Sequence, residues 1–96
     1  MAVTDKEFTC PVCGYAGLSE PAWDQGVPSY EICDCCGTEF GYEDAAADGD
    51  VPYMHERLRE NWARAGYPWT SAAGDPPAGW NPAEQMRSAG IEPPAL

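Results

Sequence analysis

Basic side chains are scarce in this sequence, which has 5 lysines and arginines against 16 aspartates and glutamates and a formal net charge of −11. Proteins that bind nucleic acids or anionic membranes present clusters of Lys and Arg. The charge balance therefore argues against both kinds of partner and favours a protein partner that is basic or neutral. Alternatively, the acidity serves only to keep a small protein soluble.

Long apolar runs are absent as well. No window reaches the ~20 consecutive apolar residues of a transmembrane helix, and residues 1–7 lack the basic start and apolar stretch of a signal peptide. We therefore expect a cytoplasmic protein. Catalytic patterns are also missing, because His55 is the only histidine and the sequence shows neither a Ser-His-Asp set nor a phosphate-binding glycine loop. The sequence thus predicts that the protein is not an enzyme.

The chain is too short and too rich in turn-forming residues for a large apolar core. It has 96 residues, of which 10 are prolines and 10 are glycines, and small domains of this kind usually need a covalent or metal cross-link. Its 5 cysteines are an odd number in a chain without a leader, which favours metal thiolates in a reducing compartment over a disulfide framework. A metal ion is therefore the expected cross-link.

Two segments share a pattern that is typical of metal binding. Residues 10–14 and 33–37 both read C-x-x-C-G, and 19 residues separate Cys13 from Cys33. Two cysteines so spaced in a tight turn point both sulfurs at one place. A second such turn completes a tetrahedral set of four sulfurs, which suits Zn²⁺ or a single iron ion. The predicted metal ligands are Cys10, Cys13, Cys33 and Cys36.

A fifth cysteine, Cys35, breaks the symmetry of the two segments. It could replace Cys33 or Cys36 as a ligand, but only the pair Cys33 and Cys36 reproduces the spacing and the following glycine of the first segment. We therefore expect Cys35 to be an inert thiol close to the metal, with a redox or catalytic role as the alternative.

Apolar and aromatic residues flank both segments, among them Phe8, Tyr15 and Phe40, and they suit short strands on either side of each turn. The proline-containing segment 19–28 predicts a loop. The sequence therefore predicts a small α+β metal-stapled domain. In this fold, a zinc-ribbon-like or rubredoxin-like pair of knuckle hairpins is followed by one amphipathic helix and a short C-terminal helix.

The longer helix is predicted over residues 51–65, where Asp50 can cap the first turn and Gly66 suits the left-handed position after the end. Apolar residues fall on one face of this helix: Val51, Met54, Leu58, Trp62 and Ala65. The opposite face carries Glu56, Arg59, Glu60 and Ala63. We expect the apolar face to cover the metal-bound hairpins, with an exposed groove for a partner as the alternative. His55 is expected at the surface or at the edge of the apolar face, without a partner.

The short helix is predicted from Asn81, which can cap the first turn together with Glu84, to Gly90. Both helices are expected to end in a Schellman motif with an apolar contact: Tyr67 on Trp62, and Ile91 on Met86. The whole chain is expected to be one domain. Its expected parts are a four-cysteine half in 1–44, a linker and the longer helix in 45–69, and a loop, the short helix and a tail in 70–96.

A family resemblance is carried by two stretches: Cys10-Pro-Val-Cys-Gly-Tyr15 and Ser29-Tyr-Glu-Ile-Cys33-x-x-Cys36-Gly-x-Glu-Phe40-Gly-Tyr-x-Asp44. They resemble the CPCC-type cysteine-rich proteins, an uncharacterised family of small bacterial proteins. The likeness continues through Glu60-Asn-Trp62 and Trp80-Asn-Pro-x-Glu-Gln85, and so covers most of the chain. Cys35 and the residue before it depart from the usual pattern of that family. The resemblance implies a metal-stapled cytoplasmic protein and supplies no activity.

The two cysteine turns are also similar to those of rubredoxin, which carries an aromatic residue soon after each turn, as Tyr15 and Phe40 do here. The loop between the turns is shorter than in free-standing rubredoxins, and the helix and tail have no counterpart there. This second likeness implies an iron tetrathiolate and one-electron transfer.

Two functions are compatible with these features. The first is a structural zinc protein that acts as an interaction or adaptor module, with an immunity-type pairing as one form of that role. Four thiolates leave zinc no open position for hydrolytic chemistry. The expected docking surface is an acidic rim in and around a solvated linker, 43–50: Glu39, Glu43, Asp44, Asp48 and Asp50, with Tyr42 and Tyr53 nearby. The alternative is a rubredoxin-like one-electron carrier with iron in the same site.

Overall fold

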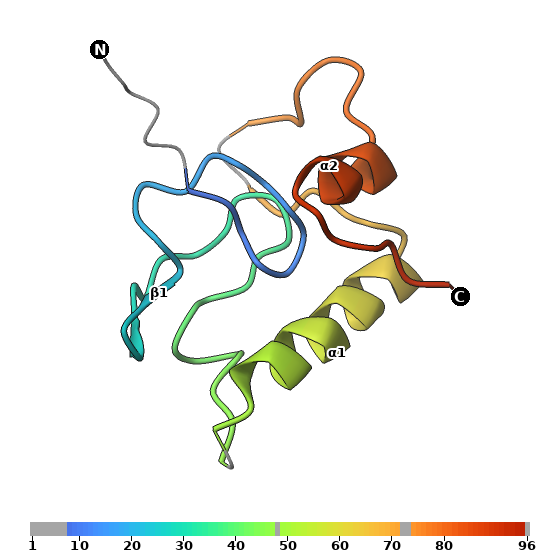
Figure 1. Cartoon of the computed structure of the whole chain (residues 1–96). Helices are drawn as coiled ribbons and strands as arrows, with labels where there is room; N and C mark the ends of the chain where they lie inside the picture. Colours follow the sequence, from blue (N-terminus) through green and yellow to red (C-terminus); the bar gives the residue numbers. More distant parts are fainter. Residues whose placement is uncertain (1–7, 48, 72–73, 96) are drawn as a thin grey trace.

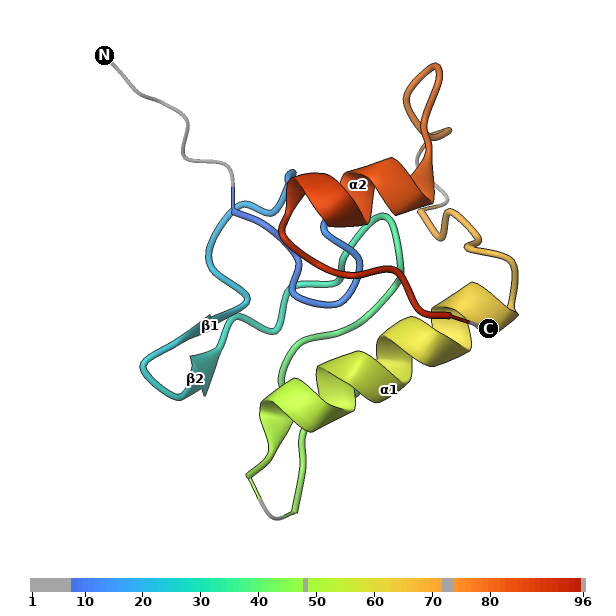
Figure 2. The same ribbon diagram turned by 45° about the vertical axis from the view of Figure 1, so that its right-hand side comes forward.

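The computed structural model describes residues 8–47, 49–71 and 74–95. Its regular elements are two short strands and two helices: β1 (Trp23–Asp24), β2 (Val27–Pro28), α1 (Val51–Arg64) and α2 (Pro82–Ser88). The two cysteine-bearing turns lie beside both helices, with α1 along one side and α2 along another (Figure 1, Figure 2). The expected α+β class with one longer and one short helix is therefore confirmed. No helix in the described part of the chain is long and apolar enough to cross a membrane.

The strands expected around the cysteine turns are reduced to single pairings. Phe8 forms one antiparallel bridge with Leu18, and Ile32 forms one with Glu39. An isolated two-stranded ribbon is only marginally stable in water, and no third strand is paired with either bridge in the described residues. Each cysteine turn is thus closed by one bridge rather than carried on a hairpin of regular strands.

A regular hairpin occurs instead in segment 19–28, where the prediction of a loop was wrong. Its register pairs Trp23 with Pro28 and Asp24 with Val27. The connecting residues Gln25 and Gly26 have φ values of 53° and 82°, and two successive positive φ values are typical of a type I′ hairpin turn. Gln-Gly is a weaker hairpin signal than Asn-Gly, and Pro28, which has no amide hydrogen, argues against a strand. For these two reasons the hairpin was not predicted from the sequence.

The ends of α1 agree with the prediction. Asp50 accepts a hydrogen bond from the Tyr53 amide at 3.1 Å and so caps the first turn. At the other end Gly66 has a φ of 93°, and the Tyr67 amide donates to the Trp62 carbonyl at 3.0 Å. The rings of Trp62 and Tyr67 meet edge to face with centroids 5.0 Å apart. The expected Schellman motif with its apolar contact is therefore present.

The buried face of α1 differs from the predicted one. His55, Trp62 and Ala63 are buried, and Arg59 is half-buried, whereas Ala65 is exposed. The prediction had placed Arg59 and Ala63 on the outer face, because both lie away from the apolar stripe that runs from Val51 to Ala65. His55 donates to Asp44, and Arg59 donates to the Val12 carbonyl. These hydrogen bonds turn the side of α1 that carries His55 and Arg59 toward the rest of the protein.

The short helix α2 begins and ends as predicted. The Asn81 side chain accepts a hydrogen bond from the Glu84 amide at 3.0 Å. After the last turn Gly90 has a φ of 79°, and the Ile91 amide donates to the Met86 carbonyl at 2.8 Å. Met86 is fully buried, so α2 is fastened to the core through its inner face.

Cysteines and aromatic rings make up much of the interior. Four of the buried side chains are cysteines with no exposed surface: Cys10, Cys13, Cys33 and Cys35. Within the described residues, α1 and α2 have no Cα atoms within 8 Å of each other. Rings lie between them instead, in a chain of contacts with centroid separations of 5.4 to 6.4 Å: Tyr15 with Trp69, Trp69 with Trp80, and Trp80 with Trp62. The helices are therefore held together through the cysteine turns and this aromatic layer.

Asp44 is the buried centre of a network that joins three parts of the chain. Its Oδ2 accepts hydrogen bonds from Trp23 Nε1 and His55 Nε2, each at 2.7 Å, and its Oδ1 accepts one from the Gly41 amide at 2.7 Å. Asp44 is fully buried, and His55 is buried as well. The predictions of a solvent-facing Asp44 and a partnerless His55 were therefore wrong. The pairing is not visible in the sequence, because the two side-chain donors lie 21 and 11 residues away along the chain.

The rest of the predicted acidic rim remains closer to solvent. Glu39 is half-buried, and Glu43, Asp50 and the two tyrosines, Tyr42 and Tyr53, are exposed. Asp48 lies outside the described residues. The predicted rim therefore loses one carboxylate, that of Asp44, which is buried.

Replacing Asp44 with Ala should lower the free energy of unfolding by on the order of 3 kcal/mol, because three hydrogen-bond donors lose their acceptor in a buried site. The matched control is Asp24→Ala, which removes an exposed carboxylate from β1 and should change stability by less than ~0.5 kcal/mol. Urea denaturation of both variants measures the difference. Equal effects would show that the Asp44 network does not stabilise the fold.

Candidate metal centre

The two C-x-x-C-G segments form the same backbone turn. The Gly14 amide donates to the Cys10 carbonyl, and the Gly37 amide donates to the Cys33 carbonyl, both at 2.9 Å. Gly14 and Gly37 have φ values of 85° and 79°, which residues with a side chain rarely adopt. One more hydrogen bond closes each turn: Cys10 amide to Tyr15 carbonyl at 2.8 Å, and Cys33 amide to Thr38 carbonyl at 3.0 Å. The repeat seen in the sequence is therefore also a repeat in the backbone.

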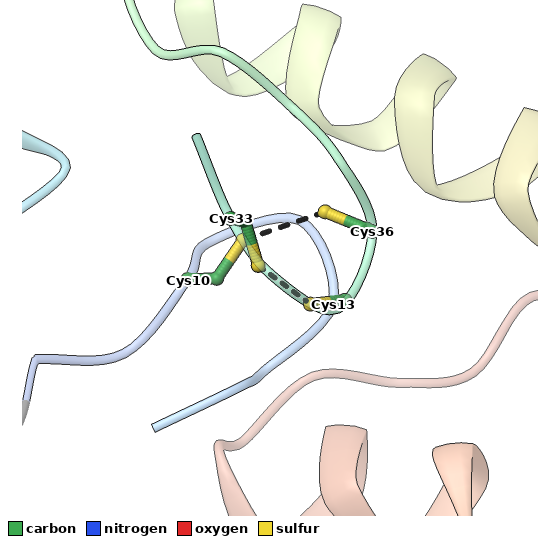
Figure 3. Close-up of side chains that lie close together, drawn as sticks. All are labelled: Cys10, Cys13, Cys33 and Cys36. Atoms are coloured by element: carbon green, nitrogen blue, oxygen red, sulfur yellow. Dashed lines mark hydrogen bonds between the residues drawn. The ribbon is translucent and has the colours of Figure 1, made fainter. Parts of the chain in front are cut away.

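The turns bring all four predicted ligands together. Figure 3 shows their side chains with the sulfur atoms pointing toward one another: Cys10, Cys13, Cys33 and Cys36. Cys10 Sγ lies 3.8 Å from Cys36 Sγ, and Cys13 Sγ lies 3.7 Å from Cys33 Sγ. All four sulfurs lie within 4.8 Å of one another. Each short distance joins one turn to the other, so neither turn forms the site alone.

These separations fit a metal ion held by four thiolates. With a zinc–sulfur bond of about 2.3 Å, two sulfurs of a regular tetrahedron lie about 3.8 Å apart, close to the 3.7 and 3.8 Å found here. All five cysteines are free, so no disulfide withdraws a sulfur from the group. The four residues can therefore hold a metal ion, and both zinc and iron accept this ligand set.

The crowding of the sulfurs also affects their protonation. The pKa of the Cys13 thiol is raised far above its ordinary value by its hydrogen bond with Cys10, by contacts with the other sulfurs, and by burial. The pKa of Cys36 is lowered, first of all by its hydrogen bond with Cys10. Opposite shifts at neighbouring sulfurs mean that Cys13 and Cys36 do not lose their protons independently. A divalent cation would let all four exist as thiolates, which is the form that binds metal.

Glycine in each turn also leaves room for a covering segment. A Cβ atom at Gly14 would lie 2.8 Å from the Gln85 carbonyl oxygen and 3.1 Å from Met86 Cα, so α2 packs directly on the first turn. A Cβ atom at Gly37 would lie 2.7 Å from Thr70 Cγ2. The glycine after each C-x-x-C therefore serves both the backbone conformation and the close approach of a later part of the chain.

Two long polar side chains fasten the helices to the first turn. From α1, Arg59 donates through Nε to the Val12 carbonyl at 2.7 Å and through Nη2 to the Pro11 carbonyl at 2.8 Å. From α2, Gln85 Nε2 donates to the Cys13 carbonyl at 3.0 Å. Sequence analysis missed both residues, because a hydrogen bond to a backbone carbonyl 47 or 72 residues away leaves no sequence pattern.

Two groups near the site make hydrogen bonds with the sulfurs. The Val12 amide donates to Cys10 Sγ at 3.4 Å, and the Thr38 hydroxyl lies 3.3 Å from Cys36 Sγ. Hydrogen bonds of this kind favour the charged form of an acceptor. The Val12 amide would therefore stabilise a thiolate at Cys10, and the Thr38 hydroxyl, which accepts from the Cys36 thiol, can turn to donate to a thiolate at Cys36.

Cys35 lies outside the group of four sulfurs. It is fully buried, and its Sγ lies 3.4 Å from Gln85 Nε2. The pKa of Cys35 is lowered, first by a hydrogen bond with Cys13 and to a smaller degree by the one with Gln85, while burial acts in the opposite direction. The expectation of an inert thiol is compatible with this burial and stays a prediction.

Two uncharacterised proteins of Bacillus subtilis (strain 168) are similar to part of the chain. YoaQ is 39% identical over 51 residues, which is 51% of this chain and 41% of YoaQ. YozI is 41% identical over 49 residues, which is 48% of this chain and 38% of YozI. The chain thus spans about two fifths of the length of these curated relatives. Neither a protein-family model nor a solved structure matches the chain.

These similarities confirm the coarser part of the resemblance stated above. Uncharacterised bacterial relatives exist at modest identity, and the structure contains the cluster of four cysteines. Membership of the CPCC-type group stays a prediction. The names of the two relatives carry no activity that could be compared with the site.

Gly14→Ala should be more damaging than Gly26→Ala, although both glycines have almost the same positive φ, 85° and 82°. The strain of a left-handed alanine costs roughly 1–2 kcal/mol at either position. Only at Gly14 would the new methyl group collide with α2, whereas nothing lies within 4 Å of a Cβ at Gly26. We expect an additional loss of about 2 kcal/mol for Gly14→Ala, measured by urea denaturation. Equal losses would mean that α2 does not rest on this turn.

Arg59→Met should lower the free energy of unfolding by about 2 kcal/mol, because two charge-assisted hydrogen bonds to carbonyls of the first turn are lost. Arg57→Met is the matched control on the same helix, since Arg57 is exposed and its contacts within the described residues are with Tyr53, one turn away on α1. Its thermal and urea denaturation curves should overlay those of the parent protein. Equal stability of the two variants would show that Arg59 does not stabilise the first cysteine turn.

Proposed function

We propose that the protein binds one zinc ion through Cys10, Cys13, Cys33 and Cys36 and that this ion stabilises the fold. The observation that carries the proposal is the convergence of four sulfurs from two separate turns, within 4.8 Å of one another. Three of the four side chains are fully buried, and Cys36 is partly buried. An ion bound there would cross-link turns that are distant in the sequence and would favour the folded chain over the unfolded one.

The proposed role of the ion is structural rather than catalytic. Four protein ligands fill a tetrahedral zinc site and leave no position for water or substrate, which zinc hydrolases require. We therefore propose no enzymatic reaction at this site.

We further propose that the protein is an interaction or adaptor module for a basic or neutral protein in the cytoplasm. A formal charge of −11 favours association with cationic surfaces. The exposed tyrosines Tyr42 and Tyr53 support this role, since tyrosine is enriched at protein interfaces and both lie near the exposed carboxylates Glu43 and Asp50 in the sequence. An immunity-type pairing with a basic partner is one form of this proposal.

A rubredoxin-like electron carrier is the second candidate, with iron in place of zinc. It is supported by the partial exposure of the residue Cys36 and by the amide hydrogen bond from Val12 to Cys10 Sγ. Hydrogen bonds to sulfur and solvent exposure both tune the potential of iron–sulfur sites. An oxidised iron protein would be red, and a zinc protein would be colourless.

Metal analysis and chelation test the proposal directly. Protein purified under reducing conditions with both metals supplied should contain one zinc ion per chain and show no visible absorption band. Removal of the ion with a strong chelator should abolish the cooperative unfolding transition seen by circular dichroism, and added zinc should restore it. A protein that stays cooperatively folded after chelation, with five reactive thiols, would refute the structural metal.

Single serine variants identify the ligands. Ser at Cys10, Cys13, Cys33 or Cys36 should reduce zinc content and stability strongly. Cys35→Ser is the matched control, because it removes a buried thiol outside the sulfur group and should keep one zinc ion per chain. If Cys35→Ser lost zinc and Cys36→Ser kept it, Cys35 would be the ligand in place of Cys36.

A further inference from the structure

A mostly apolar groove of about 830 Å³ lies between the β1–β2 hairpin, the linker residues Ala45, Ala46 and Gly49, and the first turns of α1. Figure 1 shows this hairpin and the start of α1 on the two sides of that region. The volume is within the range of roughly 300–1,000 Å³ that is usual for ligand sites. The residues that define its walls include Phe8, Pro11, Trp23, Ala46, Pro52 and His55.

The polar groups behind the groove fix two of its walls. Trp23 and His55 both donate to Asp44 at 2.7 Å, and Asp44 is buried and does not line the groove, so a hydrogen bond to the interior holds each ring. Among the lining residues that the structure describes, His55 alone has an ionisable side chain. Hydrogen bonds to a buried carboxylate therefore fix two of the rings that line the groove.

The chain segments that line the groove are rich in carboxylates and poor in basic residues. Four exposed carboxylates are direct chain neighbours of lining residues: Glu20, Asp24, Asp50 and Glu56. Asp44 adds a buried carboxylate behind Trp23 and His55. Among the described lining residues and their immediate neighbours in the chain there is no Lys or Arg. Arg59 reaches the Pro11 carbonyl, but its Nε and Nη2 already donate to the first cysteine turn.

We propose that this groove docks a basic peptide segment of another protein. An apolar side chain of the segment packs against Trp23 and His55, and flanking Lys or Arg side chains lie beside the carboxylates of the rim. Apolar anchors in a preformed pocket supply most of the affinity of such contacts, and complementary charges at the rim guide association. This inference rests on the interaction role proposed above and gives it a place, but it does not depend on which metal the cysteines hold.

The test uses the full chain as purified and three synthetic hexapeptides with blocked ends: RLALLR, its charge-reversed form ELALLE, and RSASSR, which lacks the apolar anchors. In nitrogen-15 spectra, RLALLR should shift the indole resonance of Trp23 and leave that of Trp62 in place. Calorimetry in 150 mM salt should give binding at least tenfold weaker for RSASSR than for RLALLR, and none for ELALLE. Equal binding of RLALLR and RSASSR would indicate charge attraction alone and would overturn the proposal.

Groove-filling variants locate the binding. Ala46→Trp places a large side chain in the groove, and it should weaken RLALLR binding at least tenfold. Ala78→Trp is the matched control, since Ala78 is exposed and does not line the groove, and it should bind as the parent protein does. Ala45→Trp, at the neighbouring lining residue, replaces Ala46→Trp if the latter unfolds. Unchanged binding in the groove variants would overturn the proposal.

A second copy of this chain is the competing occupant. If the groove is a homodimer interface, the parent protein will be a dimer at the concentration of the spectra and Ala46→Trp will be a monomer, which also overturns the proposal. Metal content is measured on the same samples. A failure of the structural zinc site therefore shows as missing zinc, and a failure of the groove shows as missing peptide binding in a protein that keeps its metal and its fold.

Discussion

The convergence of two short turns on one point is the constraint that organises this protein. Each turn contributes two sulfurs, and the short sulfur–sulfur distances all cross from one turn to the other. Much of the remaining chain covers these turns: α2 rests on Gly14, Thr70 rests on Gly37, and α1 holds the first turn through Arg59. Because the helices do not approach each other directly, the turns and the aromatic rings beside them act as the common centre. A chain this short gains a defined interior by this arrangement without a large sheet or bundle.

A second, independent centre lies at Asp44. It joins β1, the end of the second cysteine turn and α1 through three hydrogen bonds at 2.7 Å, and it contains the only histidine of the chain. A buried carboxylate with three donors is satisfied rather than strained. The same network fixes the rings of Trp23 and His55 at the groove. Two centres thus stabilise the molecule: the group of four cysteines and the hydrogen-bond network of Asp44. The groove lies next to the Asp44 network.

The features that the sequence predicted are those with short-range causes. Caps, Schellman motifs and the C-x-x-C-G turns depend on a few neighbouring residues, and Asp50, Gly66 and Asn81 were placed correctly for that reason. The α+β class and the grouping of the four cysteines followed from the same local patterns. The burial of Asp44 and the inward face of Arg59 were not predictable in this way, since each depends on partners that only the folded chain brings near. The hairpin in 19–28 was missed because its turn residues are an uncommon pair for that geometry.

The close packing of α2 against Gly14 also bears on the order in which the molecule is assembled during synthesis. The last of the clustered sulfurs, on Cys36, leaves the ribosome well before Gln85, whose side chain reaches back 72 residues to the Cys13 carbonyl. An ion can therefore enter while the nascent chain still leaves one side of the first turn open to the surrounding solution. When the C-terminal part arrives, α2 packs on the first turn at Gly14 and covers that side of the sulfur group.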